Sequence, residues 1–175
     1  GIVGIIKKNK KTVNTDELKR FTNSLIHRGP DSFGIYLNKE NYVGLGHRRL
    51  SIIDLSNLGH QPMTIEERFT LVFNGEIYNF QDIKRALKIL GHSFRSESDT
   101  EVLLHSYIEW GPECQSKFNG MWAFSIWDDL KKQLFISRDR FGVKPIYYLN
   151  NKDNFFFSSE LKSFMKLVKE NIPEF

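Results

Sequence analysis

The sequence has 175 residues, of which 40% are hydrophobic and 26% are charged, values typical of one globular domain with a full core. Its net charge of +4 is mild and its basic residues are scattered, so no nucleic-acid-binding surface is predicted. No apolar run reaches the length of a membrane span, and no segment has the pattern of a signal peptide. The single cysteine cannot form an internal disulfide, which favours a reducing, cytoplasmic setting.

The first third of the chain predicts a strand, a helix and a hairpin. Residues 1–6 form an apolar run that is typical of a buried strand. Asn14, with Glu17 three residues later, resembles a capping box, and apolar residues follow at helical spacing until the helix ends before Arg28. The hairpin and the loop after it are expected at residues 34–37 with 42–53, and at residues 54–63.

The stretch Phe69–Phe80 offers the first chemical signal. Its apolar start, Phe69–Phe73, predicts a buried strand, and Asn74-Gly75 is a strong turn signal. Asn74 supplies an amide donor and Gly75 leaves a backbone N–H open to a ligand, so the two could hold an oxyanion. Taken alone, the stretch is interpreted more simply as a hairpin turn with a solvated Glu76.

The rest of the chain predicts helices and then strands. A helix over 81–90 ends at Gly91, and Ser98 with Glu101 forms a capping box for a helix that ends before Gly111 and Pro112. The remaining elements are four strands and a closing helix with Leu161, Phe164, Met165 and Val168 inward, at residues 121–127, 134–138, 146–149, 155–159 and 161–169. This order predicts an α+β domain with antiparallel sheets covered by helices.

Motifs for metals and nucleotides are missing from the sequence. The five His and one Cys show no metal-ligand spacing, and the chain has no Walker loop, GxGxxG or SGGxDS segment. Metal and nucleotide sites are therefore not predicted. Cys114 is expected on a short helix as a small core residue, and not as a nucleophile.

Seven segments occur in a telling order: HRGPD at 27–31, GHRRLSIIDLS at 46–56, GHQPM at 59–63, FNGEIYNF at 73–80, SDTEVLL at 98–104, FNGMWAFSIWD at 118–128 and RDRFGVKPIYY at 138–148. Together they resemble the N-terminal glutaminase domain of glutamine-dependent asparagine synthetases. That domain is a class II glutamine amidotransferase of the N-terminal-nucleophile (Ntn) hydrolase type. The resemblance covers essentially the whole chain.

The resemblance implies a four-layer α-β-β-α sandwich of two antiparallel sheets that hydrolyses glutamine to glutamate and ammonia. It implies this amidotransferase domain over residues 1–170, and over 171–175 the start of a linker to an absent C-terminal synthetase domain. In the family, that absent domain uses ATP and Mg²⁺ to amidate aspartate to asparagine. The expected partners are glutamine and the synthetase domain, and a homodimer is left open. No nucleic acid, membrane or cofactor is expected for this domain. Another acceptor, such as a sugar or antibiotic precursor, stays open because the absent domain selects it.

The resemblance also assigns site residues. Asn74 and Gly75 would form the oxyanion hole, Arg49 would hold the α-carboxylate of glutamine, and Glu76 and Asp99 would hold its α-ammonium. The planar guanidinium of Arg49 suits a carboxylate. Asp99 also has a structural explanation, because a helix dipole favours a negative charge in the first turn. Arg48 is expected to be a solvated neighbour on the opposite face of its strand.

The nucleophile of the family is an N-terminal Cys directly before a Gly-Ile-x-Gly strand, whereas this sequence begins at that Gly. Such a thiol, with an ordinary pKa of about 8.5, has beside it an α-amino group of pKa about 7.7–8.0 that acts as its base. Cys114 has no free amine and cannot replace it. Either a Cys precedes Gly1 in the full protein, or the chain is an inactive scaffold domain. We favour the first, since the expected binding residues are all present.

Overall fold

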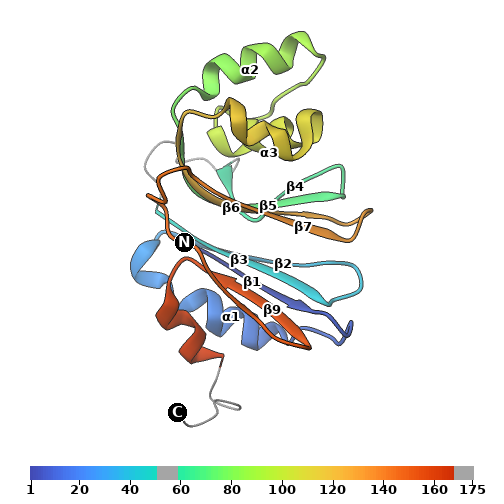
Figure 1. The fold of residues 1–175 in the computed structure, drawn as a ribbon, viewed down its shortest axis with the longest axis vertical. Coiled ribbons are helices and arrows are strands. Elements are labelled where there is room, and N and C mark those ends of the chain that lie inside the picture. The colour runs from blue at the N-terminus through green and yellow to red at the C-terminus, as the bar shows by residue number, and fades with distance from the viewer. Residues whose placement is uncertain (51–58, 168–175) are drawn as a thin grey trace. The chain divides into compact units, whose positions relative to one another are not determined.

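The computed structural model describes residues 1–50 and 59–167. The chain forms two compact units, Gly1–Leu50 with Pro145–Phe175, and Ser51–Lys144. Each unit has its own antiparallel sheet with helices against it, which confirms the α+β class with two antiparallel sheets (Figure 1). Within the described ranges, no helix combines the length and the apolar character that crossing a bilayer requires.

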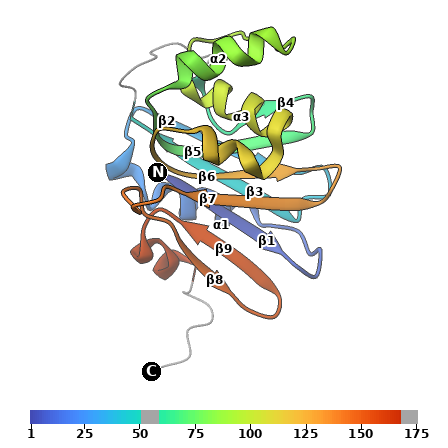
Figure 2. The same ribbon diagram turned by 45° about the horizontal axis from the view of Figure 1, so that its top comes forward.

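The first unit contains a five-stranded sheet in the order β2-β3-β1-β9-β8. The strands are β1 (Ile2–Lys7), β2 (Ser32–Leu37), β3 (Val43–Arg49), β8 (Tyr147–Asn150) and β9 (Asn154–Ser158). All their pairings are antiparallel, and β8 is an edge strand that forms a hairpin with β9 (Figure 2). The other elements are α1 (Thr15–Asn23) and the 3-10 segments η1 (Ile26–Arg28) and η4 (Leu161–Lys166).

Helix α1 packs on one face of this sheet because that face carries glycines. The side chain of Asn14 caps the helix by accepting the N–H groups of Asp16 and Glu17, as predicted. A Cβ at Gly46 of β3 would lie 2.1 Å from Thr22 Oγ1 of α1. Only a residue without a side chain allows α1 to approach β3 this closely.

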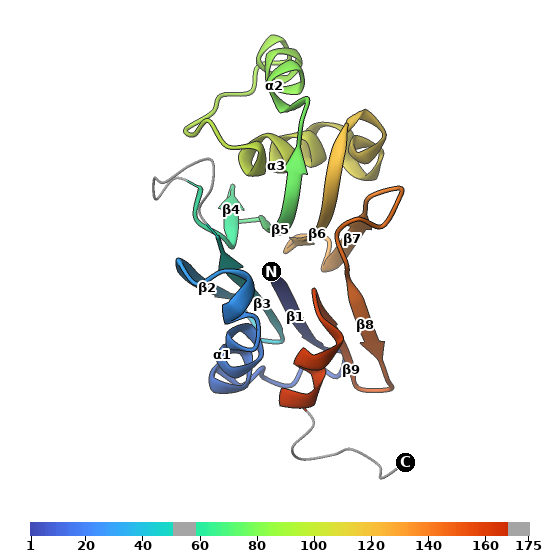
Figure 3. The same ribbon diagram turned by 90° about the vertical axis from the view of Figure 1, so that its left-hand side faces the viewer.

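The second unit contains a four-stranded sheet in the order β4-β5-β6-β7. Its strands are β4 (Met63–Ile65), β5 (Phe69–Ile77), β6 (Gly120–Asp128) and β7 (Gln133–Arg138). Its helices are α2 (Phe80–Ile89), α3 (Asp99–Trp110) and the 3-10 segment η3 (Gly111–Lys117). The odd-numbered apolar residues of β5 pack with apolar residues of α2 and α3. The chain passes from the end of β5 into α2 (Figure 3).

Most predicted elements are confirmed. Helix α2 ends at Ile89, two residues before Gly91, which has a φ of +97°, and α3 lies between its caps Ser98 and Gly111. The four C-terminal strands are also confirmed, although β6 and β7 belong to one sheet and β8 and β9 to the other. Strand β4 has no counterpart among the predicted elements, because Met63 falls in the loop expected over residues 54–63.

Three predictions need correction. The hairpin strand expected over 42–53 already ends at Arg49. The closing helix is a 3-10 segment in which Phe164 is buried, whereas Leu161 and Met165 are 65% and 67% exposed. Asn74-Gly75 is not a turn, because β5 continues through both residues while paired with β6. Residues 51–58, Val168 and the tail 171–175 lie outside the described residues.

Candidate active site

The expected oxyanion hole lies in the middle of a strand. Asn74 pairs with Ala123 and Gly75 with Trp122 along β6, and neither Asn74 nor Gly75 has a positive φ. Gly75 is required by this close pairing, because a Cβ there would lie 2.1 Å from the carbonyl oxygen of Met121. The Asn-Gly pair therefore lies in a closely paired stretch of β5 and β6, and not in the hairpin turn that its sequence signal suggests.

The direction of the Gly75 N–H follows from the hydrogen-bond pattern of β5 and β6. Tyr78, directly after β5, donates its N–H to the carbonyl oxygen of Asn119 at 2.7 Å in the same register, so the even-numbered residues of β5 bond to β6. The N–H of Gly75 then points to the other edge of β5. Strand β4 pairs only with residues 69–71 and does not reach it. The described strand pairing leaves this N–H without an acceptor.

The side chain of Asn74 supplies a second unpaired donor. Its amide nitrogen Nδ2 is buried and has no hydrogen-bond partner among the described residues. A buried amide donor without a partner costs free energy, and a ligand acceptor at this position would remove that cost. Asn74 and Gly75 thus contribute two neighbouring donors, one from a side chain and one from the backbone, which is the composition of an oxyanion hole.

Two carboxylates accompany these donors. Asp99 is the first residue of α3, and its Oδ2 accepts the N–H of Ile77 at 3.1 Å. Burial raises the pKa of Asp99 above its ordinary value, the N–H groups of Ile77 and Thr100 counteract this in part, and the charge of Glu76 raises it further. Repulsion between Glu76 and Asp99 would be relieved by a cation, which makes this pair suitable for an ammonium group.

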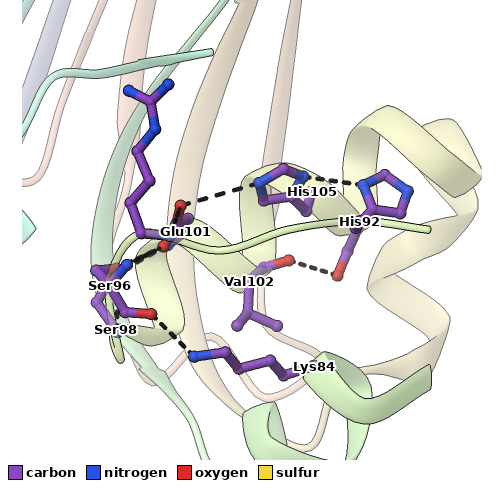
Figure 4. Close-up of polar contacts among 9 residues, drawn as sticks. Lys84, His92, Ser96, Ser98, Glu101, Val102 and His105 are labelled. Atoms are coloured by element: carbon purple, nitrogen blue, oxygen red, sulfur yellow. Dashed lines mark hydrogen bonds and ion pairs between the residues drawn. The ribbon is translucent and has the colours of Figure 1, made fainter. Parts of the chain in front are cut away.

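A polar network holds the start of α3 (Figure 4). The hydroxyl of Ser98 accepts the N–H of Glu101, as the capping box predicts. The carboxylate of Glu101 does not bond back to Ser98, however, and instead accepts the N–H groups of Arg95 and Ser96 at 2.9 and 2.7 Å. Lys84 donates to the carbonyl oxygen of Ser96. These contacts fix the helix turn that carries Asp99.

In the first unit, Arg48 and Arg49 point to opposite faces of β3, as predicted. Arg48 lies on the same face as Gly46, where it donates to the side chain of Asn23 in α1 at 2.5 Å and covers the ring of Phe33. Arg48 is thus half-buried, and the prediction of a solvated side chain is wrong. Arg49 is half-buried, and the alternation of side chains along β3 places it on the face opposite Arg48.

Strand β1 continues its pairing up to the first residue. Gly1 and Arg48 exchange both backbone hydrogen bonds, at 2.7 and 2.8 Å. A Cβ on Gly1 would lie 3.0 Å from Leu25 Cδ1 and 3.4 Å from Arg28 Cδ. Gly1 therefore faces the α1 side of the sheet, together with Arg48.

Cys114 is buried in η3, in agreement with its predicted role in the core. Burial raises the pKa of its thiol to about 12, so the thiolate is not formed at neutral pH. In residues 1–50 and 59–167, no group of three or more His, Cys, Asp or Glu side chains is arranged to hold a metal ion.

One polar residue beside β5 was assigned no role from sequence. Gln61 belongs to the GHQPM segment, is 6% exposed, and accepts the N–H of Phe73 through its side chain. A glutamine two residues before an edge strand gives no sequence signal of burial. Its contacts appear only in the folded structure.

Comparisons with known proteins identify the family of the chain. The chain matches the family model described as "Glutamine amidotransferase domain" over residues 1–173. It is 41% identical to asparagine synthetase [glutamine-hydrolyzing] 3 of Bacillus subtilis, covering 94% of this chain and 27% of that protein. Asparagine synthetase 1 of the same organism is 44% identical, covering 94% of this chain and 26% of that protein. A putative asparagine synthetase of Methanocaldococcus jannaschii is 41% identical, covering 99% and 36%.

Solved structures show the same fold at lower identity. Glutamine phosphoribosylpyrophosphate amidotransferase from B. subtilis matches with a TM-score of 0.78 and 20% identity, over 95% of this chain and 43% of that chain. An allosteric regulatory enzyme of purine biosynthesis matches with a TM-score of 0.81, also at 20% identity and with the same coverage. The chain thus spans 26% to 36% of the length of the asparagine synthetases named above. Because the family model matches residues 1–173, the chain belongs to the glutamine amidotransferase domain family.

Proposed function

We propose that this domain hydrolyses the side-chain amide of glutamine, with a Cys directly before Gly1 as nucleophile. The observation that carries the proposal is the pair of unpaired donors on β5, the buried Nδ2 of Asn74 and the N–H of Gly75. Such donors stabilise the negative charge that develops on a carboxamide oxygen during attack. Glu76 and Asp99 bind the α-ammonium, and Arg49 binds the α-carboxylate.

The register of β1 and β3 supports the position of the nucleophile. Gly1 stands opposite Arg48 in a hydrogen-bonded pair, so a residue joined to Gly1 would stand opposite Arg49 in a non-hydrogen-bonded pair. Side chains in such pairs share one face of the sheet, with Cβ atoms about 4.5–5.5 Å apart. The thiol would thus lie beside the guanidinium that binds the substrate carboxylate.

The reaction follows from these groups. The α-amino group of the Cys takes the thiol proton, and Sγ forms a bond to Cδ of glutamine. The oxyanion accepts hydrogen bonds from Asn74 and Gly75 until the C–N bond breaks and ammonia leaves with the proton from the amine. Water then hydrolyses the thioester, which releases glutamate and regenerates the thiol.

We further propose that the ammonia serves ATP- and Mg²⁺-dependent amidation of aspartate in a C-terminal synthetase domain of the full protein, in the cytoplasm. Support comes from relatives named glutamine-hydrolysing asparagine synthetases, which extend well beyond the matched region. Neither an inactive scaffold nor another acceptor is favoured by a specific observation.

The test is glutamate release from glutamine by the chain preceded by an N-terminal Cys. The matched control replaces that Cys by Ala. We expect turnover with Cys and none above background with Ala, while both proteins show the same thermal unfolding midpoint. Equal rates in the two proteins, or no turnover in either, would contradict the proposal.

A further inference from the structure

Gln61 connects the two parts of the second unit that carry the donors and the carboxylates. Its Oε1 accepts the N–H of Phe73 at 2.6 Å, and its Nε2 lies 3.5 Å from Thr100 Oγ1. Gln61 and Thr100 are each only 6% exposed. Phe73 directly precedes the donor Asn74, and Thr100 directly follows the carboxylate Asp99, so one buried amide contacts both neighbours.

The edge of β5 shows why this contact matters. Beyond β4, three N–H groups point to this edge, those of Phe73, Gly75 and Ile77. Gln61 accepts the first and Asp99 accepts the third. The middle one, on Gly75, is left for a ligand. Two side-chain acceptors therefore flank the oxyanion donor on both sides.

The two flanking acceptors belong to one connected structure. Asp99 begins α3, whose first turn is fixed by the Ser98 cap and by the hydrogen bonds of Glu101. Thr100, in the same turn, is the residue that Gln61 contacts. The segment from Asn74 to Glu76 is thus held at both ends against the same helix turn.

We propose that Gln61 is a positioning residue that keeps the oxyanion donors of β5 in register with Asp99 at the start of α3. This inference rests on the proposed glutaminase function. Gln61 touches neither substrate nor reacting atoms, and it acts through Phe73 and Thr100. Without it, β5 and α3 are joined only through Ile77 and Asp99, so this remaining hydrogen bond opens more often and the donors and the ammonium site move relative to each other.

Steady-state kinetics test the positioning in the chain that carries the N-terminal Cys. Gln61→Met keeps the length of the side chain but removes both polar contacts. We expect kcat/KM per titrated active site to fall roughly 10- to 100-fold, because a misplacement of about 1 Å costs up to about 100-fold. Thr100→Val removes only the contact on α3 and should raise KM about threefold with a smaller change in kcat. The matched control is Thr70→Val, which removes a hydrogen bond between Thr70, near the start of β5, and Thr64 of β4. It should leave both constants unchanged.

Amide hydrogen exchange tests the same inference without activity. In Gln61→Met, the N–H of Ile77 should exchange at least about tenfold faster relative to the N–H of Ile126, a fully buried residue of β6. Equal acceleration at both residues indicates a general loss of stability and overturns the positioning role, as does a parental kcat/KM per active site. If the parent chain does not hydrolyse glutamine, the proposed function fails, while the exchange ratio still decides whether Gln61 holds β5 against α3.

Discussion

At each outer edge of the β5–β6 pair an aspartate accepts a backbone N–H of the strand, but the pKa of one aspartate is lowered and that of the other is raised. On the β6 side, β7 ends at Arg138, and Asp139 accepts the N–H of Trp122. On the β5 side, β4 has ended, and Asp99 accepts the N–H of Ile77. Trp122 is the direct partner of Gly75, so the two edges flank the same level of the sheet.

The difference lies in how many donors each carboxylate receives. Asp139 also accepts the N–H groups of Phe141, Val143 and Lys144. Although burial opposes its ionisation, these donors outweigh burial and lower its pKa. Burial raises the pKa of Asp99, because fewer donors and the charge of Glu76 leave the cost of burial uncompensated. A saturated carboxylate stabilises a loop, whereas an unsaturated one beside a second carboxylate can bind a cation.

The largest effect is expected at the donors of the β5 edge. Asn74→Ala removes the unpaired Nδ2 and should lower kcat for glutamine roughly 10²- to 10³-fold, with a small change in KM. Steady-state glutamate release measures both constants. Ser125→Ala is the matched control, because Ser125 Oγ is another buried atom without a partner among the described residues, yet it has no proposed role. A similar kcat in the two variants would show that the unpaired amide does not serve the reaction.

The next effect separates the two aspartates in binding. Asp99→Asn should raise KM for glutamine about 30-fold, which corresponds to about 2 kcal/mol for a charge pair with the α-ammonium. Asp139→Asn should change KM far less, since Asp139 is occupied by backbone donors. Initial rates over a range of glutamine concentrations decide this. Equal increases in KM would remove the distinction between the two edges.

For the free energy of unfolding, unlike for KM, the substitution of Asp139 should have the larger effect. The pKa of Asp139 is lowered on folding, so its contribution is present above the unfolded pKa of about 3.9 and is lost as the pH falls through the folded pKa. Asp139→Asn should therefore lower the free energy of unfolding at pH 7 by about 2 kcal/mol. The pKa of Asp99 is raised, so its ionised form costs stability at pH 7. Asp99→Asn should therefore not lower the free energy of unfolding. Urea unfolding measures both, and a more stable Asp139→Asn protein would contradict this.

The smallest expected effect is a pH dependence of binding. Protonated Asp99 cannot pair with the α-ammonium, so KM should rise as the pH falls through the raised pKa of Asp99. The increase is about twofold where the pH equals that pKa. The Asp99→Asn variant should lose this dependence. A parental profile in that variant would assign the titration to another group.

Local signals predicted much of the fold. Caps at Asn14 and Ser98, together with Gly91 and Gly111, gave the helix limits within a few residues, because capping depends on neighbours in sequence. The strand through Asn74-Gly75 could not be predicted in this way. The turn preference of this dipeptide is overridden by pairing with residues 122 and 123, which are distant in sequence.

The candidate site followed from the resemblance more than from local patterns. The residue types at Asn74, Gly75, Glu76 and Asp99 were identified, but the direction of the Gly75 N–H depends on which edge of β5 bonds to β6. The role of Gln61 was missed for a similar reason. Its partners, Phe73 and Thr100, are 12 and 39 residues away in the sequence.

The central claim is that Asp99 at the edge of β5 is an unsaturated carboxylate that binds the ammonium of glutamine. An NMR titration of the Asp99 carboxyl carbon tests it most directly, in the chain whose N-terminal Cys is replaced by Ala so that glutamine is not consumed. We expect a raised pKa in the free protein that falls when glutamine is added, with no change at Asp139. A pKa of Asp99 that is the same with and without saturating glutamine would contradict the account.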